Sequence, residues 1–186
     1  MKTALIVIDV QESFRHRPYF SNADVAEYLM HQNALIEGSK QRGIAIIRVF
    51  HVEGEKVAGN AFAVESGHVR PWQGLADFDA ALTVHKHRHS ALVGTGLDIW
   101  LTQQGIQKLI ISGIRTEQCC ETTTRHASDL GWQVDYVTDA TLTFDMQNAD
   151  GSALSAADIK TRTATVLQGR FARVCTVQEA LESSRP

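Results

Sequence analysis

The chain has 186 residues, of which 44% are hydrophobic and 21% are charged, and its formal net charge is −3. These values are typical of a globular protein, and we expect a single domain over residues 1–186. No basic block is present, which argues against nucleic acid or a membrane surface as a partner, and no apolar run reaches the roughly 18 residues of a membrane span. Three cysteines, two of them adjacent, make no disulfide framework, so we expect a reducing, cytoplasmic setting.

Hydrophobic runs along the chain predict six strands that alternate with helices. The strands are expected at residues 3–8, 44–50, 81–84, 107–112, 132–137 and within 170–176, and the helices at residues 22–43, 95–104, 117–130, 153–168 and 177–184. This alternation over short connections predicts a parallel sheet with helices on both faces. The expected fold class is therefore α/β, a three-layer α/β/α sandwich around a central, mostly parallel, six-stranded, Rossmann-like sheet.

Two segments without periodicity, residues 52–80 and 141–152, are predicted to be loops. A loop as long as the first is often functional in a compact domain. We expect any single ring-bearing side chain in it to fix the loop to the surface, and at least one to line a pocket. These side chains are Phe62, His68, Trp72 and Phe78.

Two charged residues follow predicted strands. Asp9 comes directly after the strand 3–8, where open α/β folds bind their ligands, although an aspartate here could equally cap a turn. Lys86 follows the strand 81–84, and the alternative for it is a solvated surface charge. With Cys119, these residues are far apart in the sequence, and the predicted sheet brings all three to one edge.

Cys119 lies in the first turn of the helix predicted from residue 117. Unpaired backbone N–H groups and the helix dipole favour thiolate over thiol there, and the same N–H groups could hold an oxyanion. The alternative is that Cys119 and Cys120 are small apolar residues that pack the helix against the sheet. Cys175 falls in the last predicted strand and is interpreted as core packing.

Three histidines alternate at positions 85, 87 and 89. On an extended segment they would point the same way and could converge on a metal ion. No Cys, Asp or Glu lies at ligand spacing nearby, so the sequence disfavours a metal site formed by His85, His87 and His89. Whether these histidines or His51 have any role is left open.

Four stretches, in their order along the chain, resemble the isochorismatase-like cysteine hydrolases, a family that includes nicotinamidases and N-carbamoylsarcosine amidase. Residues 4–11 resemble the first strand with its catalytic aspartate, and residues 86–97 resemble the catalytic-lysine segment. Residues 113–123 resemble the nucleophile motif, and Asp139-Ala140 matches the next landmark. Each motif alone is weak, whereas the ordered set is specific and covers nearly the whole chain.

The resemblance assigns roles to individual residues. It implies that Cys119 is the nucleophile, that Asp9 shuttles the proton and that Lys86 stabilises both electrostatically. It also implies a cis peptide bond between Ile114 and Arg115, with the backbone N–H groups of Arg115 and Cys119 forming an oxyanion hole. The expected reaction is cleavage of an amide or carbamoyl-type C–N bond of a small molecule through a thioester on Cys119.

Departures from the family pattern narrow this expectation. Nicotinamidases carry a metal-binding Asp-x-His after the second strand, and residues 49–53 here read Val-Phe-His-Val-Glu without that aspartate. We therefore expect neither a metal nor another cofactor. Isochorismatases that cleave a vinyl ether generally lack the cysteine, and Leu92 replaces a usual phenylalanine. An isochorismatase-type or nicotinamidase-type hydrolase remains an alternative, as does a thiol-redox or non-catalytic binding protein on the same fold.

The sequence does not name the substrate. The side chains expected to line its pocket are Gln11, Phe14, His51, Trp72 and Gln118. Whether the side chain of Arg115 also reaches the substrate is left open. The resemblance further implies a homo-oligomer, a dimer or a tetramer.

Overall fold

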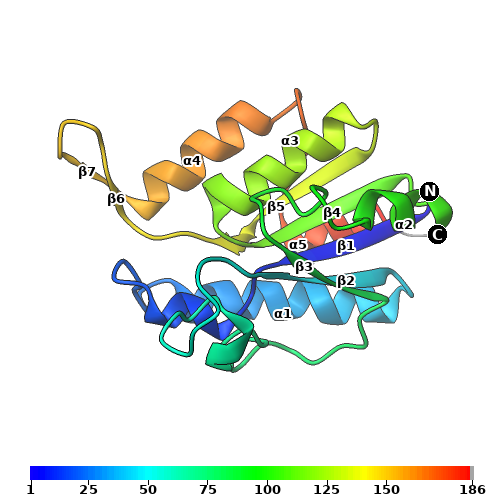
Figure 1. The fold of residues 1–186 in the computed structure, drawn as a ribbon. Helices are drawn as coiled ribbons and strands as arrows, with labels where there is room; N and C mark the ends of the chain where they lie inside the picture. Colours follow the sequence, from blue (N-terminus) through cyan, green and yellow to red (C-terminus); the bar gives the residue numbers. More distant parts are fainter. Residues whose placement is uncertain (185–186) are drawn as a thin grey trace.

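The computed structural model describes residues 1–184. Six strands form a central sheet in the order β3-β2-β1-β4-β5-β8, and every pair of neighbours is parallel (Figure 1). The strands are β1 (Thr3–Ile8), β2 (Ala45–His51), β3 (Leu82–Lys86), β4 (Lys108–Ile114), β5 (Gln133–Leu142) and β8 (Arg173–Cys175). The predicted α/β class with a six-stranded parallel sheet is confirmed.

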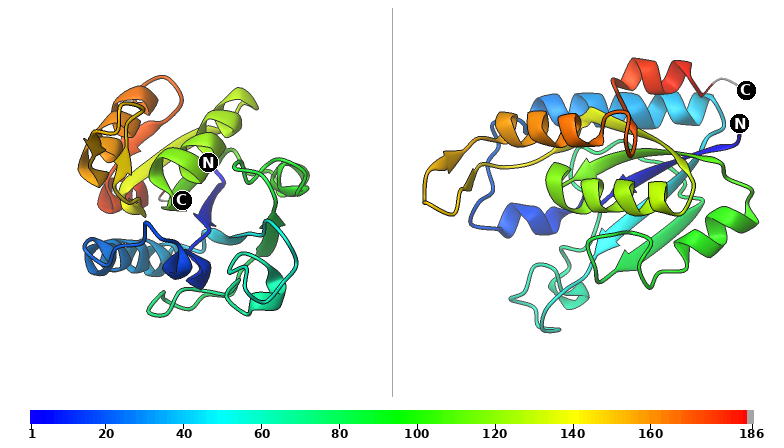
Figure 2. Two further views of the ribbon diagram at one scale, coloured as in Figure 1. Left: turned by 60° about the vertical axis from the view of Figure 1, so that its left-hand side comes forward. Right: turned by 90° about the horizontal axis from the view of Figure 1, so that it is seen from above.

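Helices cover both faces of this sheet, as Figures 1 and 2 show. They are α1 (Val25–Gln41), α2 (Leu97–Gln103), α3 (Glu121–Asp129), α4 (Ala156–Leu167) and α5 (Val177–Glu182). The side chains that alternate along β1 separate the two cores: Leu5 and Val7 pack with α1 and α5, whereas Ile6 and Ile8 pack with α2, α3 and α4. Because β1 is buried on both faces, its sequence is apolar throughout instead of alternating.

Some element boundaries differ from the prediction. Strand β3 continues to Lys86, so this lysine ends the strand instead of following it. Strand β5 continues to Leu142 and includes Asp139, with a register shift against β4 after Ile111. Both strands continue past polar or charged residues because their backbones remain paired with the neighbouring strands. The hydrophobic pattern does not report backbone pairing, so it placed the strand ends too early.

Two further differences concern segments near the sheet's carboxyl edge. The predicted loop 141–152 contains β6 (Met146–Gln147), which pairs with β7 (Ala153–Leu154) in an antiparallel hairpin. Figure 2 shows that this hairpin extends from the body at the end opposite to the two termini. The helix predicted from residue 117 begins instead with a π-helical turn, Thr116–Cys120, before α3.

Among residues 1–184, no helix combines the length and the hydrophobicity that crossing a bilayer would demand.

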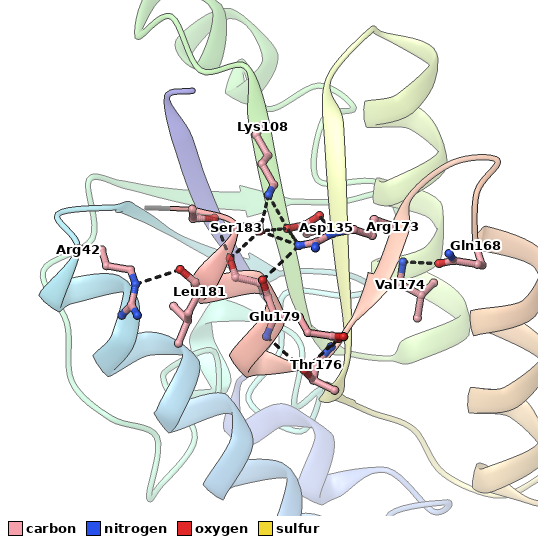
Figure 3. A network of polar contacts seen from close by, with 12 residues as sticks. Arg42, Lys108, Asp135, Gln168, Arg173, Val174, Thr176, Glu179, Leu181 and Ser183 are labelled. Atoms are coloured by element: carbon pink, nitrogen blue, oxygen red, sulfur yellow. Dashed lines mark hydrogen bonds and ion pairs between the residues drawn. The ribbon is translucent and has the colours of Figure 1, made fainter. Parts of the chain in front are cut away.

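A polar network fastens the last strand and helix to the amino-terminal edge of the sheet (Figure 3). Asp135 on β5 binds Arg173 on β8 through two hydrogen bonds of 2.8 and 2.7 Å, and Lys108 on β4 at 2.6 Å. Ser183, just after α5, donates to the same carboxylate at 3.1 Å. Burial on its own would raise the pKa of Asp135, but hydrogen bonds from Arg173 and Lys108 hold it below its ordinary value.

We expect Asp135→Asn to lower the free energy of unfolding by about 3 kcal/mol, because it leaves the buried Lys108 without its carboxylate. The folded-state pKa of Asp135 lies below its unfolded value of 3.8, so this stabilisation is present above about pH 4 and is lost as the pH falls through the folded pKa. Urea unfolding across this pH range measures both effects. Asp129→Asn, at the exposed end of α3, is the control. An equal decrease in the free energy of unfolding in both variants would contradict the expectation. So would a decrease in Asp135→Asn that does not become smaller in acid.

Candidate active site

The candidate site lies where four adjacent strands end at the carboxyl edge of the sheet. Asp9 follows β1, His51 ends β2, Lys86 ends β3, and Cys119 lies in the π-helical turn after β4. In the register of the sheet, His51 is the direct neighbour of Lys86. Residues that are far apart in the sequence therefore meet because their strands are neighbours in the order β3-β2-β1-β4.

The backbone on either side of Asp9 is unusual. Asp9 has a φ of 54°, in the left-handed region that aspartate tolerates better than most residues, and its N–H donates to Val49 O at 2.9 Å. Gly113 faces the last residue of β1, and a Cβ there would lie 2.0 Å from the carbonyl oxygen of Ile8. Only glycine allows β4 to pass β1 this closely next to the site.

Lys86 is at the centre of the site. Its side chain is completely buried, and its Nζ lies 2.7 Å from Asp9 Oδ2, 3.2 Å from Cys119 Sγ and 2.7 Å from His51 Nδ1. An ammonium has three N–H donors and no acceptor, so these contacts match its whole hydrogen-bonding capacity. The alternative of a solvated surface lysine is therefore wrong.

The hydrogen bond with Lys86 also fixes the tautomer of His51. Since an ammonium can only donate, His51 Nδ1 accepts and the ring proton lies on Nε2. Nε2 then donates to Glu53 Oε2 at 3.0 Å. Gln11 holds this segment from the other side, since its amide accepts from His51 N at 2.7 Å and donates to His51 O at 3.0 Å.

Burial and charge move the pKa values in this cluster in definite directions. Burial raises the pKa of Asp9 in spite of the opposing ammonium. Burial alone would lower the pKa of Lys86, but the negative charge of Asp9 raises it above the ordinary value, so Lys86 remains an ammonium. Burial, followed by the charge of Lys86, lowers the pKa of His51, which agrees with a neutral ring.

The thiol of Cys119 behaves differently from the sequence-based expectation. Burial, followed by the charge of Asp9, raises the pKa of Cys119 well above the ordinary thiol value, and Lys86 opposes this only in part. Cys119 is therefore a thiol at rest and not the thiolate that a helix terminus favours. The physical reason is that Cys119 is 7% exposed, and burial together with the charge of Asp9 disfavours a thiolate more strongly than Lys86 stabilises it.

A group with metal-ligand geometry is present at the same point. Ligand atoms of Asp9, His51 and Cys119 all lie within 4.8 Å of one another. Each of these residues also contacts Lys86 Nζ at the distances given above. The ammonium thus takes the place that a cation would need, and it supplies the positive charge between the three groups.

A cavity of about 290 Å³ opens onto Asp9 and Cys119. Of the side chains expected to line it, Phe14, His51 and Gln118 do so. Gln11 does not line the cavity, because its amide is used up on the backbone of His51. Trp72 does not either, because it is 1% exposed and packs in the core against Phe20.

The structure adds lining residues that the sequence analysis did not identify as pocket residues. These are Arg17, Tyr19, Glu53 and His89. Phe62, one of the four candidates from the long loop, lines the cavity as well. Phe62 confirms that at least one ring of residues 52–80 lines a pocket. Arg17 and Tyr19 come from the segment after β1, and the only available signal for them was that this segment directly follows Asp9.

Arg115 contributes to the cavity wall through its side chain. The Ile114–Arg115 peptide bond is cis, at the position that the resemblance implies. The guanidinium lies over the ring of Tyr19 at 4.7 Å and pairs with Glu117 at 3.0 Å. The side chain therefore borders the cavity, with its charge already balanced by a carboxylate.

The alternating histidines do not converge. His85 packs beside Phe50, with the ring centroids 5.6 Å apart, and His87 donates from Nδ1 to Val52 O at 2.8 Å. His89 lies at the cavity. Within the described part of the chain, His85 and His87 belong to no group with metal-ligand geometry. Cys175 is buried in the core, as predicted, and all three cysteines are free thiols.

Comparison with known proteins agrees with the fold and with the motifs. The isochorismatase domain model matches residues 3–179. The isochorismatase family protein YrdC of Bacillus subtilis is 26% identical, over 97% of this chain and 95% of that protein. A cysteine hydrolase from Pseudomonas syringae has the same fold, with a TM-score of 0.86, 24% identity, and coverage of 97% of this chain and 91% of the other. Nicotinamidase 3 of Arabidopsis thaliana is 36% identical over a shorter stretch, 40% of this chain and 37% of that protein.

The electrostatics of the cluster predict an unusual response to the loss of Asp9. Asp9→Asn removes a charge that raises the pKa of Cys119 and leaves Lys86 beside Sγ, so we expect the thiol pKa to fall. Alkylation of Cys119 by iodoacetamide at neutral pH should accelerate, by about tenfold for each unit of pKa. Site-resolved mass spectrometry measures this rate. Asp79→Asn, an exposed position, should leave the rate unchanged. An unchanged or slower rate in Asp9→Asn would show that Asp9 does not control the thiol.

Proposed function

The chain belongs to the isochorismatase family of hydrolases, and from this membership we propose that it cleaves an amide or carbamoyl-type C–N bond of a small molecule, with Cys119 as the nucleophile. The observation that carries the proposal is the contact of one buried ammonium, Lys86 Nζ, with both Asp9 Oδ2 and Cys119 Sγ. A base, a thiol and a fixed positive charge are the parts that this chemistry needs.

The first half of the reaction forms a thioester. Asp9 accepts the thiol proton while Cys119 Sγ attacks the carbonyl carbon, and the carbonyl electron pair moves onto its oxygen. A carboxylate whose pKa is raised by burial is a stronger base than an ordinary aspartate, which suits it to a thiol whose pKa is raised as well. The ammonium of Lys86 stabilises the negative charge whether it lies on the carboxylate or on the sulfur.

The second half releases the products. The tetrahedral intermediate collapses, the C–N bond breaks, and Asp9 returns its proton to the leaving nitrogen. Water then attacks the thioester while Asp9 takes a proton from that water. The C–S bond breaks, and Asp9 passes the proton to the sulfur, which restores both the thiol and the carboxylate. The backbone N–H groups of Arg115 and Cys119 are the proposed donors to the oxyanion in both halves.

The identity of the nucleophile is tested by two neighbouring substitutions. We expect Cys119→Ala to abolish ammonia release from a panel of small amides and carbamoyl compounds. Cys120→Ala should keep much of the activity, because Cys120 is completely buried and only packs the turn. A mass adduct on Cys119, trapped during turnover, should accompany ammonia release.

The pair of variants separates the competing functions. Loss of activity in Cys120→Ala and retention in Cys119→Ala would reject the assignment of the nucleophile. Absence of both adduct and ammonia across a broad panel would favour a redox or binding protein. Circular dichroism of both variants controls for folding.

The acid limb of the pH profile tests the role of Asp9. Asp9 accepts a proton only when ionised, and burial raises its pKa above the ordinary 3.8. Activity should therefore fall as the pH falls through a value above about 4, and kcat/KM reports this pKa for the free enzyme. Measurement of kcat/KM across the acid range checks it. An acid limb at or below the ordinary carboxyl range would speak against Asp9 as the base.

A further inference from the structure

The charged groups around the cavity are matched in pairs. Asp9 is balanced by Lys86, and Arg115 is balanced by Glu117 at 3.0 Å. Arg17, the other cation that lines the cavity, forms an ion pair with Glu53. Neither guanidinium at the cavity is thus left without a carboxylate of the protein itself.

The side chain of Glu53 is 43% exposed, yet several contacts hold it in place. One of its oxygens pairs with Arg17, and the other accepts from His51 Nε2 at 3.0 Å. Its backbone is fixed as well, because its N–H donates to Phe62 O and its carbonyl accepts from Asn60 Nδ2. A substrate anion that displaced Glu53 from Arg17 would also remove the acceptor of a buried histidine that contacts Lys86.

Arg17 itself is placed to bind an anion if Glu53 were neutral. Its guanidinium lies over the ring of Phe62 at 4.2 Å, which fixes its plane beside the cavity. Its Nε is buried and has no hydrogen-bond partner within the described chain. One N–H of this guanidinium is therefore uncommitted. A guanidinium is suited to a carboxylate, and the charge of Glu53 is what opposes this use.

The remaining walls favour a small apolar body. Phe14 and Phe62 meet edge to face, with ring centroids 5.1 Å apart, and Tyr19 lies under Arg115. The volume of about 290 Å³ is at the lower end of the range for ligand cavities.

We propose that Glu53 acts as a charge filter: by neutralising Arg17 it makes the cavity select small uncharged amides and exclude amides that carry a carboxylate. The proposal rests on the proposed function in that it takes the amide as the reacting group. It assigns to Glu53 a part in specificity, distinct from the chemistry of Asp9, Lys86 and Cys119.

The test compares ligands that have nearly the same shape and differ in charge. One pair is isophthalamide and isophthalamate, and the other is succinamide and succinamate. Their affinities are measured by isothermal titration calorimetry on protein carrying Cys119→Ala, and ammonia release is measured separately on protein with Cys119. The ratio of the two affinities tests the charge filter even if the protein releases no ammonia from any amide. Absence of ammonia release would count against the proposed function alone.

We expect the wild-type pocket to bind the uncharged member of each pair more tightly. Glu53→Gln removes the charge and keeps an oxygen that can accept from His51 Nε2, so the shift should reflect the charge. We expect it to move the binding ratio toward the carboxylate by about tenfold, the size of one charge-assisted hydrogen bond. Adding Arg17→Gln to Glu53→Gln should abolish this gain.

Glu55→Gln is the matched control, because it removes the same charge from an exposed position two residues away that does not line the cavity. The proposal is overturned by tighter wild-type binding of the carboxylate, by equal shifts in Glu53→Gln and Glu55→Gln, or by a gain that survives the loss of Arg17. Undetectable binding of both pairs would overturn it as well.

Discussion

A completely buried ammonium persists in a folded protein only where acceptors surround it. Lys86 meets this condition with three acceptors that come from three other strand ends, Asp9, His51 and Cys119. Asp9 is completely buried as well, and its negative charge is in turn stabilised by the same ammonium. One ammonium therefore links groups from the ends of four neighbouring strands.

The same burial explains why the site is suited to proton transfer. It raises the pKa of the carboxyl of Asp9 and of the thiol of Cys119 together, so Asp9 is a stronger base, and Cys119 a weaker acid, than the same groups in water. Before any reaction the negative charge lies on the carboxylate of Asp9, which is paired with Lys86, and the sulfur of Cys119 is neutral. In the proposed mechanism, the proton moves from Cys119 to Asp9 as the sulfur attacks the carbonyl carbon.

The sequence predicted the location of a site residue where strand pairing determines it, and not where the folding of a loop determines it. Asp9, Lys86 and Cys119 could be located because parallel strands bring their carboxyl ends to one edge, and the order of the motifs followed the order of the strands. Which side chains line the cavity depends on how loops fold over that edge. Trp72 turned into the core, whereas Glu53 turned toward the cavity, and a loop sequence without periodicity carries no signal for either. The state of Cys119 also depended on tertiary burial, which its place near a helix start could not reveal.

The site therefore divides between two kinds of structure. Strand ends carry the proposed reacting groups, and their geometry follows from the pairing of the sheet, so it cannot change without changing the fold. The walls come largely from the segments after these strands, and those after β1 and β2 supply Arg17 and Glu53. His51 joins the two parts, because one ring nitrogen accepts from Lys86 and the other donates to Glu53. The proposed charge filter and the proposed reacting groups are thus linked through one neutral ring.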